Sequence, residues 1–143
     1  MTNVNPTDDE LRAILSTNRT IAVVGASSSH DRASYGVMKT LMAAGFNVIP
    51  VTPREPRILG RTTYATLADI PEPVDIVDVF RRAEDTPAIA DDAVKIGAKV
   101  LWLQLGITSE EAATRARAGG LAVVMDLCIG KTTSRLGIKR TPQ

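Results

Sequence analysis

Residues 21–36 read IAVVGASSSHDRASYG, and this stretch decides the fold. Its four apolar residues predict a buried strand, the small residues after them predict a loop, and a helix is predicted to begin near Ala33. A strand that turns through small residues into a helix presents backbone N–H groups, and the helix dipole there favours an anion. The stretch therefore predicts an α/β unit with a phosphate site at the strand-to-helix turn.

The turn departs from the glycine fingerprint G-x-G-x-x-G of dinucleotide-binding domains. Gly25 occupies the first glycine position, but Ser27 stands at the second and His30 at the third. The second glycine normally lets the backbone approach the pyrophosphate closely. The turn therefore predicts phosphate binding without the usual pose of NAD.

Four further apolar runs follow the first, and all five are rich in Val, Ile and Leu. Because they mostly do not alternate with polar residues, they are typical of strands buried on both faces of a parallel sheet. The runs span residues 21–24, 48–51, 74–80, 100–103 and 121–125. Helical patterns that end at glycines connect three pairs of these runs, and they span residues 33–44, 87–96 and 108–118.

Consecutive βαβ units with right-handed crossovers predict a Rossmann-like, doubly wound, five-stranded parallel sheet in three α/β/α layers. The predicted strand order is 3-2-1-4-5, with 2-1-3-4-5 as the alternative. The length of the chain predicts one domain over residues 1–143, with its core over residues 20–137. A capping box at residues 7–10 predicts a short outer helix, and the tails 1–6 and 138–143 are predicted to be loose.

Composition narrows the class of partner. The net charge of the chain is only +1, so no strong field attracts nucleic acid or an anionic membrane. Two Phe, two Tyr and one Trp are too few for a base-stacking platform. The N-terminus lacks a basic segment, which argues against a signal peptide. A single cysteine excludes an internal disulfide, so we expect a cytoplasmic protein.

Residues directly after the strands are the candidate ligand contacts, because ligands of such sheets bind outside the carboxyl ends of the strands. The second strand is followed by Arg54 rather than by the Asp or Glu that holds the ribose of NAD. A cation there suits the terminal phosphate of NADP or the 3′-phosphate of CoA, and the alternative is a solvated loop arginine. Arg32 and one of Arg81 and Arg82 are further candidates for a phosphate contact.

Three other side chains near the strand ends are candidates for chemistry. His30 has no neighbouring Ser or Cys arranged as a nucleophile, so we interpret it as a surface histidine. Cys128 is interpreted as a small apolar residue at a strand end, and a thiol that faces the ligand pocket is the alternative. Asp126 is a lone carboxylate, which is weak support for a general base. We therefore predict no catalytic residue and no metal site. Ser34 can cap the first crossover helix, and contact with the ligand is the other option.

Seven segments together match one protein family in their order and spacing. They are residues 24–27, 32–35, 48–53, 58–60, 70–82, 102–107 and 124–129. In these segments the chain resembles the stand-alone CoA-binding domain proteins, which are similar to the N-terminal domain of the succinyl-CoA synthetase α subunit and of NDP-forming acyl-CoA synthetases. After Cys128 the chain departs from the family, which tends toward Cys-Ile-Lys where this chain has Cys128-Ile129-Gly130.

The resemblance implies a Rossmann-like, nucleotide-binding domain whose cofactor is coenzyme A. The implied cofactor-binding residues are Gly25, Ala26, Ser27, Ser28, Arg32, Ser34, Tyr35, Thr52, Pro53, Arg54, Val79, Phe80, Arg81, Gln104 and Gly106. The expected function is binding of CoA or acyl-CoA without catalysis, and the alternatives are an NADP-dependent oxidoreductase and a small acyl-CoA-handling enzyme. The expected partners are CoA or acyl-CoA, with a protein partner or a homo-oligomer as further options, and neither nucleic acid nor a membrane.

Overall fold

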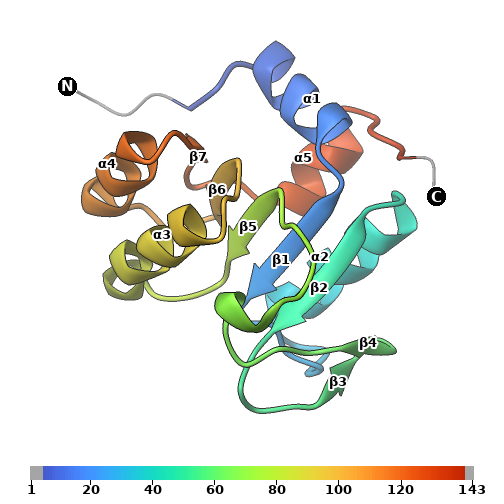
Figure 1. The fold of residues 1–143 in the computed structure, drawn as a ribbon. Coiled ribbons are helices and arrows are strands. Elements are labelled where there is room, and N and C mark those ends of the chain that lie inside the picture. The colour runs from blue at the N-terminus through green and yellow to red at the C-terminus, as the bar shows by residue number, and fades with distance from the viewer. Residues whose placement is uncertain (1–4, 141–143) are drawn as a thin grey trace.

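The computed structural model describes residues 5–140, and a five-stranded sheet forms its centre (Figure 1). The strands are β1 (Thr20–Val24), β2 (Asn47–Val51), β5 (Ile76–Val79), β6 (Val100–Leu103) and β7 (Ala122–Val124). Every neighbouring pair of these strands runs parallel. Because helices cover both faces, the predicted Rossmann-like α/β/α fold is confirmed.

The strand order is β2-β1-β5-β6-β7, so the alternative order is confirmed and the preferred order 3-2-1-4-5 is wrong. The preferred order would place β2 inside the sheet, but this strand contains Pro50, which has no N–H to donate to a neighbour. The carbonyl of Pro50 faces the outer edge, where it accepts a hydrogen bond from the N–H of Tyr64 at 3.2 Å. The carbonyl of Tyr64 in turn accepts from the N–H of Thr52 at 2.9 Å. An irregular segment therefore covers the outer edge of β2, because Pro50 prevents a further strand from pairing fully with that edge.

The helices pack on the sheet through two separate apolar clusters. On one face lie α1 (Asp8–Thr17), α2 (Ala33–Ala43) and α5 (Ile129–Arg135), and on the other lie α3 (Thr86–Lys95) and α4 (Glu110–Ala118). Along β5, Ile76 belongs to the first cluster, whereas Val77 and Val79 belong to the second. This alternation directs Asp78 and Phe80 toward α2 and α5.

The connection from β2 to β5 contains no crossover α-helix. It holds the antiparallel pair β3 (Arg57–Ile58) and β4 (Arg61–Thr62), followed by the 3₁₀ turn η1 (Leu67–Asp69). A second 3₁₀ turn, η2 (Ala83–Asp85), leads from β5 into α3. The helical patterns of the sequence leave this connection without an α-helix, as observed, but they do not predict the short hairpin.

Both ends of the described chain pack on the domain, against the prediction of loose tails. The side chain of Asn5 donates to the carbonyl of Met125 at 2.7 Å and accepts from its N–H at 2.8 Å. Ile138 is buried, and the N–H of Arg140 donates to the carbonyl of Ala44. The rest of the two predicted tails, residues 1–4 and 141–143, lies outside the described residues. No helix within residues 5–140 is long and apolar enough to cross a membrane.

Candidate functional site

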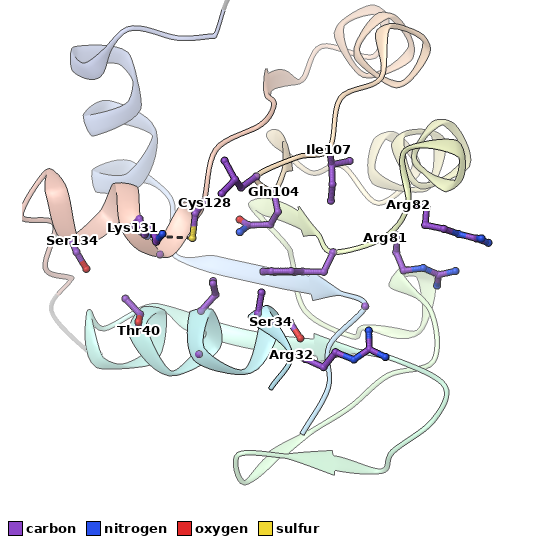
Figure 2. Close-up of a pocket in the computed structure, with 17 residues that line it drawn as sticks. Arg32, Ser34, Thr40, Arg81, Arg82, Gln104, Ile107, Cys128, Lys131 and Ser134 are labelled. Carbon is purple, nitrogen blue, oxygen red and sulfur yellow. Dashed lines mark hydrogen bonds between the residues drawn. The ribbon is translucent and has the colours of Figure 1, made fainter. Parts of the chain in front are cut away.

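An elongated cavity of about 940 Å³ opens where the ends of β1, β5 and β6 meet helices α2 and α5 (Figure 2). Ligand pockets typically enclose ~300–1,000 Å³, so the cavity has the size that a cofactor needs. Its lining residues are Gly25, Arg32, Ala33, Ser34, Gly36, Val37, Thr40, Phe80, Arg81, Arg82, Gln104, Leu105, Ile107, Cys128, Gly130, Lys131 and Ser134.

Helix α2 begins at this cavity without a side-chain cap. Its N-cap residue is Arg32, and Ser34, the candidate cap, lies inside the first turn instead. Within residues 5–140, the backbone N–H groups of Ala33 and Ser34 have no hydrogen-bond partner. Both residues line the cavity, so the helix offers an anion two free donors together with its dipole.

Three arginines surround the same end of the cavity, which we call the arginine end: Arg32, Arg81 and Arg82 (Figure 2). Arg81 and Arg82 share the carboxylate of Asp85, at 3.2 Å and 3.8 Å. Within the described chain, no carboxylate lies within ion-pair distance of Arg32. Because the three guanidinium groups have a single ion-pair partner between them among residues 5–140, Asp85, this end suits a phosphate group.

The turn after β1 is less open to a phosphate than the sequence predicts. The N–H groups of Gly25 and Ala26 both donate to the carbonyl of Val51, at 3.1 and 3.3 Å. Gly25 has a φ of +87°, and a Cβ there would lie only 2.5 Å from the carbonyl oxygen of Phe80. Glycine is therefore required by the close approach of two strand ends, and the free donors lie at the start of α2 instead.

A carboxylate of the chain itself occupies the outer part of this turn. Glu55 accepts hydrogen bonds from the hydroxyl of Ser28 and, at 3.0 Å, from its backbone N–H. These two bonds hold the pKa of Glu55 below its usual value, and the bond from the hydroxyl contributes more than the bond from the N–H. A ligand phosphate at this point of the turn must therefore displace an internal anion.

The residues after β2 do not line the cavity, and they border this turn, because Glu55 contacts Ser28. Thr52 is buried, and its hydroxyl oxygen accepts from the N–H of Arg54 at 3.2 Å. Pro53 and the side chain of Arg54 are exposed, and no carboxylate among residues 5–140 pairs with that guanidinium. Arg54 is therefore available to an anion that extends past the turn.

The opposite end of the cavity, which we call the cysteine end, is marked by Cys128. Its Sγ accepts from the N–H of Lys131 at 3.5 Å (Figure 2). The Oε1 of Gln104 accepts from the N–H of Ile129 at 2.9 Å, which leaves the amide N–H groups of Gln104 for a ligand. Asp78 lies near the sulfur and is fully buried, and burial, then the nearby Cys128, raises the pKa of Asp78 well above its usual value.

The cavity brings together some of the predicted site residues and leaves others outside. Those that line it are Gly25, Arg32, Ser34, Phe80, Arg81 and Gln104. Those that do not are Ala26, Ser27, Ser28, Tyr35, Thr52, Pro53, Arg54, Val79 and Gly106. Val79 is fully buried on the opposite face of the sheet, and the N–H of Gly106 donates to the carboxylate of Asp126 at 2.6 Å.

Sequence reasoning missed one wall of the cavity, formed by the second half of α2 and by α5. This wall contributes Val37, Thr40, Gly130, Lys131 and Ser134. Residues 129–135 read IGKTTSR, which has no apolar periodicity, so the sequence did not predict this helix. Gly130 was the available signal, because a Cβ there would already touch Val37 at 3.5 Å, and small residues allow helices to approach closely.

The remaining candidates for chemistry have structural explanations. His30 is exposed and stacks on Tyr35 with ring centroids 4.4 Å apart. Asp126 has a φ of +58°, and its carboxylate holds the turn after β6 through Gly106, so it gains no support as a general base. Among the described residues, no group of three His, Cys, Asp or Glu side chains could hold a metal ion.

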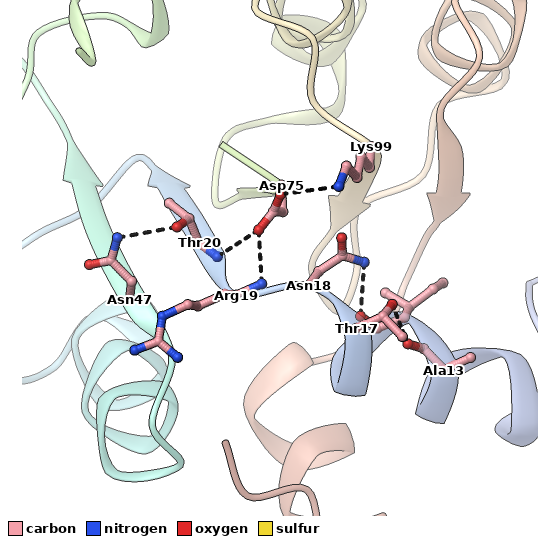
Figure 3. A network of polar contacts seen from close by, with 9 residues as sticks. Ala13, Thr17, Asn18, Arg19, Thr20, Asn47, Asp75 and Lys99 are labelled. Carbon is pink, nitrogen blue, oxygen red and sulfur yellow. Dashed lines mark hydrogen bonds and ion pairs between the residues drawn. The ribbon is translucent and has the colours of Figure 1, made fainter. Parts of the chain in front are cut away.

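At the amino end of the sheet, a separate polar network joins three strands (Figure 3). The carboxylate of Asp75 accepts from the N–H groups of Arg19 and Thr20, at 2.9 and 3.0 Å, and lies 3.7 Å from the ammonium of Lys99. These bonds fix where β1, β5 and β6 begin. The network is structural and lies at the end of the strands opposite to the cavity.

Comparisons with a family model, with sequences and with solved structures identify similar proteins. The model of the CoA binding domain family matches residues 19–134. The uncharacterized protein YneT of Bacillus subtilis is 42% identical over 125 residues, which are 87% of this chain and 93% of that protein. A solved structure of a hypothetical protein from Pyrococcus horikoshii superposes with a TM-score of 0.89 at 36% identity, over 95% of this chain and 99% of that one.

A more distant relative is an enzyme. The ADP-forming acetate–CoA ligase of Methanocaldococcus jannaschii is 26% identical over 92 residues. This match covers 64% of the present chain but only 13% of the ligase. The similarity therefore concerns a small part of that enzyme.

Proposed function

We propose that this chain, which belongs to the CoA binding domain family, binds coenzyme A or an acyl-CoA without catalysing a reaction. The observation that carries the proposal is the uncapped start of α2, with two free N–H donors beside three arginines, at one end of an elongated cavity. This is the place for the pyrophosphate of CoA, because a helix N-terminus and guanidinium groups both favour phosphate oxygens.

The rest of the cavity matches the rest of the ligand. Beyond the arginines the walls are formed by Phe80, Val37 and Ile107, which suit the apolar parts of the pantetheine arm. The free amide N–H groups of Gln104 lie along this path and offer a donor to an amide carbonyl of that arm. In the other direction, past the turn, we assign the 3′-phosphate to Arg54, because its exposed guanidinium pairs with no carboxylate of the described chain.

The absence of catalysis is supported by what the candidate reactive groups do. His30 lies outside the cavity and stacks on Tyr35, and the carboxylate of Asp126 is engaged with Gly106. Among the lining residues of the described chain, Cys128 is the one nucleophile of the thiol class, and no histidine accompanies it. Within residues 5–140, the lining side chains include no His, Asp or Glu that could act as the general base of acyl transfer to or from CoA.

A thermal-shift panel tests the binding proposal. CoA and acetyl-CoA should raise the melting temperature, since a ligand that binds only the folded state stabilises it by about 2.7 kcal/mol at a hundredfold excess over Kd. Arg32→Ala should reduce this shift, whereas Lys95→Ala, which removes an exposed cation at the end of α3, should not. A shift produced by NADP but not by CoA would overturn the proposal in favour of an oxidoreductase.

A mass-spectrometric assay tests the absence of catalysis. The protein is incubated with CoA, a panel of short-chain acids and ATP or GTP, and the mixture is searched for acyl-CoA. We expect none. Acyl-CoA that forms in excess over the protein, and is lost in a Cys128→Ser or His30→Ala variant, would show that the domain is an enzyme.

A further inference from the structure

Two polar groups at the cysteine end are not used by the binding proposal: Cys128 lines the cavity, and Asp78 lies buried behind the lining residues. Cys128 lines the cavity and is partly exposed, so its sulfur can be reached by a ligand. Its Sγ accepts a single weak hydrogen bond, from the N–H of Lys131 at 3.5 Å. The reactivity of a cysteine depends on its thiolate character and on the access of the other reactant to its sulfur.

The second group is the carboxyl of Asp78, which lies in the middle of an otherwise apolar strand. This side chain is 0% exposed, and neither of its carboxyl oxygens has a hydrogen-bond partner in the described chain. It projects from the same face of β5 as Phe80, a lining residue, and it interacts electrostatically with Cys128. A buried polar group without a partner is costly, and a polar ligand atom that enters this corner would supply the missing partner.

We infer that the cysteine end receives the thiol end of CoA, and that Cys128 is a site of thiol–disulfide exchange with CoA disulfide. The inference rests on the proposed function, because the arginine end must hold the nucleotide for the sulfur atoms to meet. Asp78 acts as a positioning residue for the pantetheine end, since it offers hydrogen-bonding capacity beside the sulfur.

The exchange is balanced without a further oxidant. The thiolate of Cys128 attacks one sulfur of CoA disulfide, a bond forms between Sγ and that sulfur, and the bond between the two CoA sulfurs breaks. The second CoA leaves as a thiolate and takes up the proton that Cys128 has lost. The products are a protein–CoA mixed disulfide and one free CoA, and a small thiol reverses the reaction.

Intact-mass spectrometry of the full chain tests this inference, because Cys128 is the only cysteine. The protein is mixed with CoA disulfide or with glutathione disulfide, and the rate of single-adduct formation is measured. We expect CoA disulfide to react roughly tenfold faster or more, because binding orients the two sulfurs. Adenosine 3′,5′-bisphosphate should slow this reaction to the glutathione rate, a reducing agent should reverse it, and Cys128→Ser should abolish it.

The outcomes separate the inference from the proposed function. If reduced CoA binds in calorimetry but the two disulfides react at equal rates, or the bisphosphate has no effect, the inference is overturned and the binding function stands. If reduced CoA binds neither the wild type nor Cys128→Ser, both fail.

A second variant tests whether the thiol end of CoA lies beside Asp78. Asp78→Leu keeps a similar shape and removes both oxygens, so it should weaken CoA several-fold and leave adenosine 3′,5′-bisphosphate, which lacks the pantetheine arm, unchanged. Circular dichroism checks that the variant folds. Equal weakening of both ligands, or of neither, would contradict the placement of the thiol end beside Asp78.

Discussion

Arg54 is the residue that should distinguish CoA from its 3′-dephospho form. Its guanidinium is exposed past the turn and pairs with no carboxylate of the described chain, so a ligand phosphate meets it without competition. Arg54→Ala should weaken CoA by roughly tenfold, because a charge-assisted hydrogen bond is lost. The affinity for dephospho-CoA, measured by the same calorimetric titration, should stay within about twofold of the wild type.

The control for this variant is Lys95→Ala, which changes the net charge equally at a distance from the cavity. It should leave both affinities unchanged. If Arg54→Ala weakens the two ligands equally, or neither, then Arg54 does not contact the 3′-phosphate and is a solvated loop residue.

Glu55 should oppose the binding of an anion at the turn. Hydrogen bonds from Ser28 keep its pKa low, so the carboxylate is charged at neutral pH and occupies a donor that a phosphate could use. Glu55→Gln keeps the shape but removes the charge, and it should tighten CoA binding several-fold at low salt. Glu84→Gln, an exposed carboxylate in η2, is the matched control. Weaker binding by Glu55→Gln would mean instead that Glu55 contacts the ligand directly.

At the scale of elements, the sequence predicted every strand of the main sheet and four of its helices, because apolar runs, caps and glycines are local signals. The strand order is not local, and Pro50 was the one residue that could have settled it, since a proline in β2 disfavours an interior position. Helix α5 was not predicted because, apart from Ile129, its buried residues are small or polar. Gly130 and Thr133 pack at positions where larger apolar residues would have produced a helical pattern.

The turn between β1 and α2 should depend on Gly25 for stability. Gly25→Ala forces a side chain into a positive φ and places its Cβ 2.5 Å from the carbonyl oxygen of Phe80. We expect a loss of about 1–3 kcal/mol in the free energy of unfolding, measured by urea denaturation without ligand. Gly36→Ala is the contrasting control, because a Cβ meets nothing within 4 Å inside α2. It should raise stability by about 0.5–1 kcal/mol, and equal effects of the two variants would contradict the account.

Part of the site could be predicted, because the topology of a parallel sheet determines where the strands end. Residues that directly follow strands, such as Phe80 and Gln104, line the cavity because parallel strands end at one edge. Val79 faces the other side of the sheet, and Tyr35 turns toward His30. The place of Cys128 in the cavity could not be predicted without the position of α5. Asp78 was overlooked because it lies inside an apolar run and its burial depends on the whole sheet.

For the whole molecule, Asp78 should make stability fall as the pH rises. Its pKa in the folded protein is raised well above the ordinary value of 3.8, so the folded state holds this proton more tightly than the unfolded state. The stabilisation is fully present below pH 3.8 and is lost as the pH rises through the raised pKa. Asp78→Asn removes this titration, so its melting temperature should exceed that of the wild type increasingly from acid to neutral pH. A constant difference across the pH range would show that the carboxyl titrates normally.

We propose that CoA places its pyrophosphate on the uncapped start of α2. The most direct measurement is a ¹H–¹⁵N correlation spectrum of the labelled protein during titration with CoA. The amide signals of Ala33 and Ser34, which have free N–H groups in the unliganded chain, should move most as these groups donate to phosphate oxygens. Saturable binding that leaves these two signals in place and moves others instead would contradict the account.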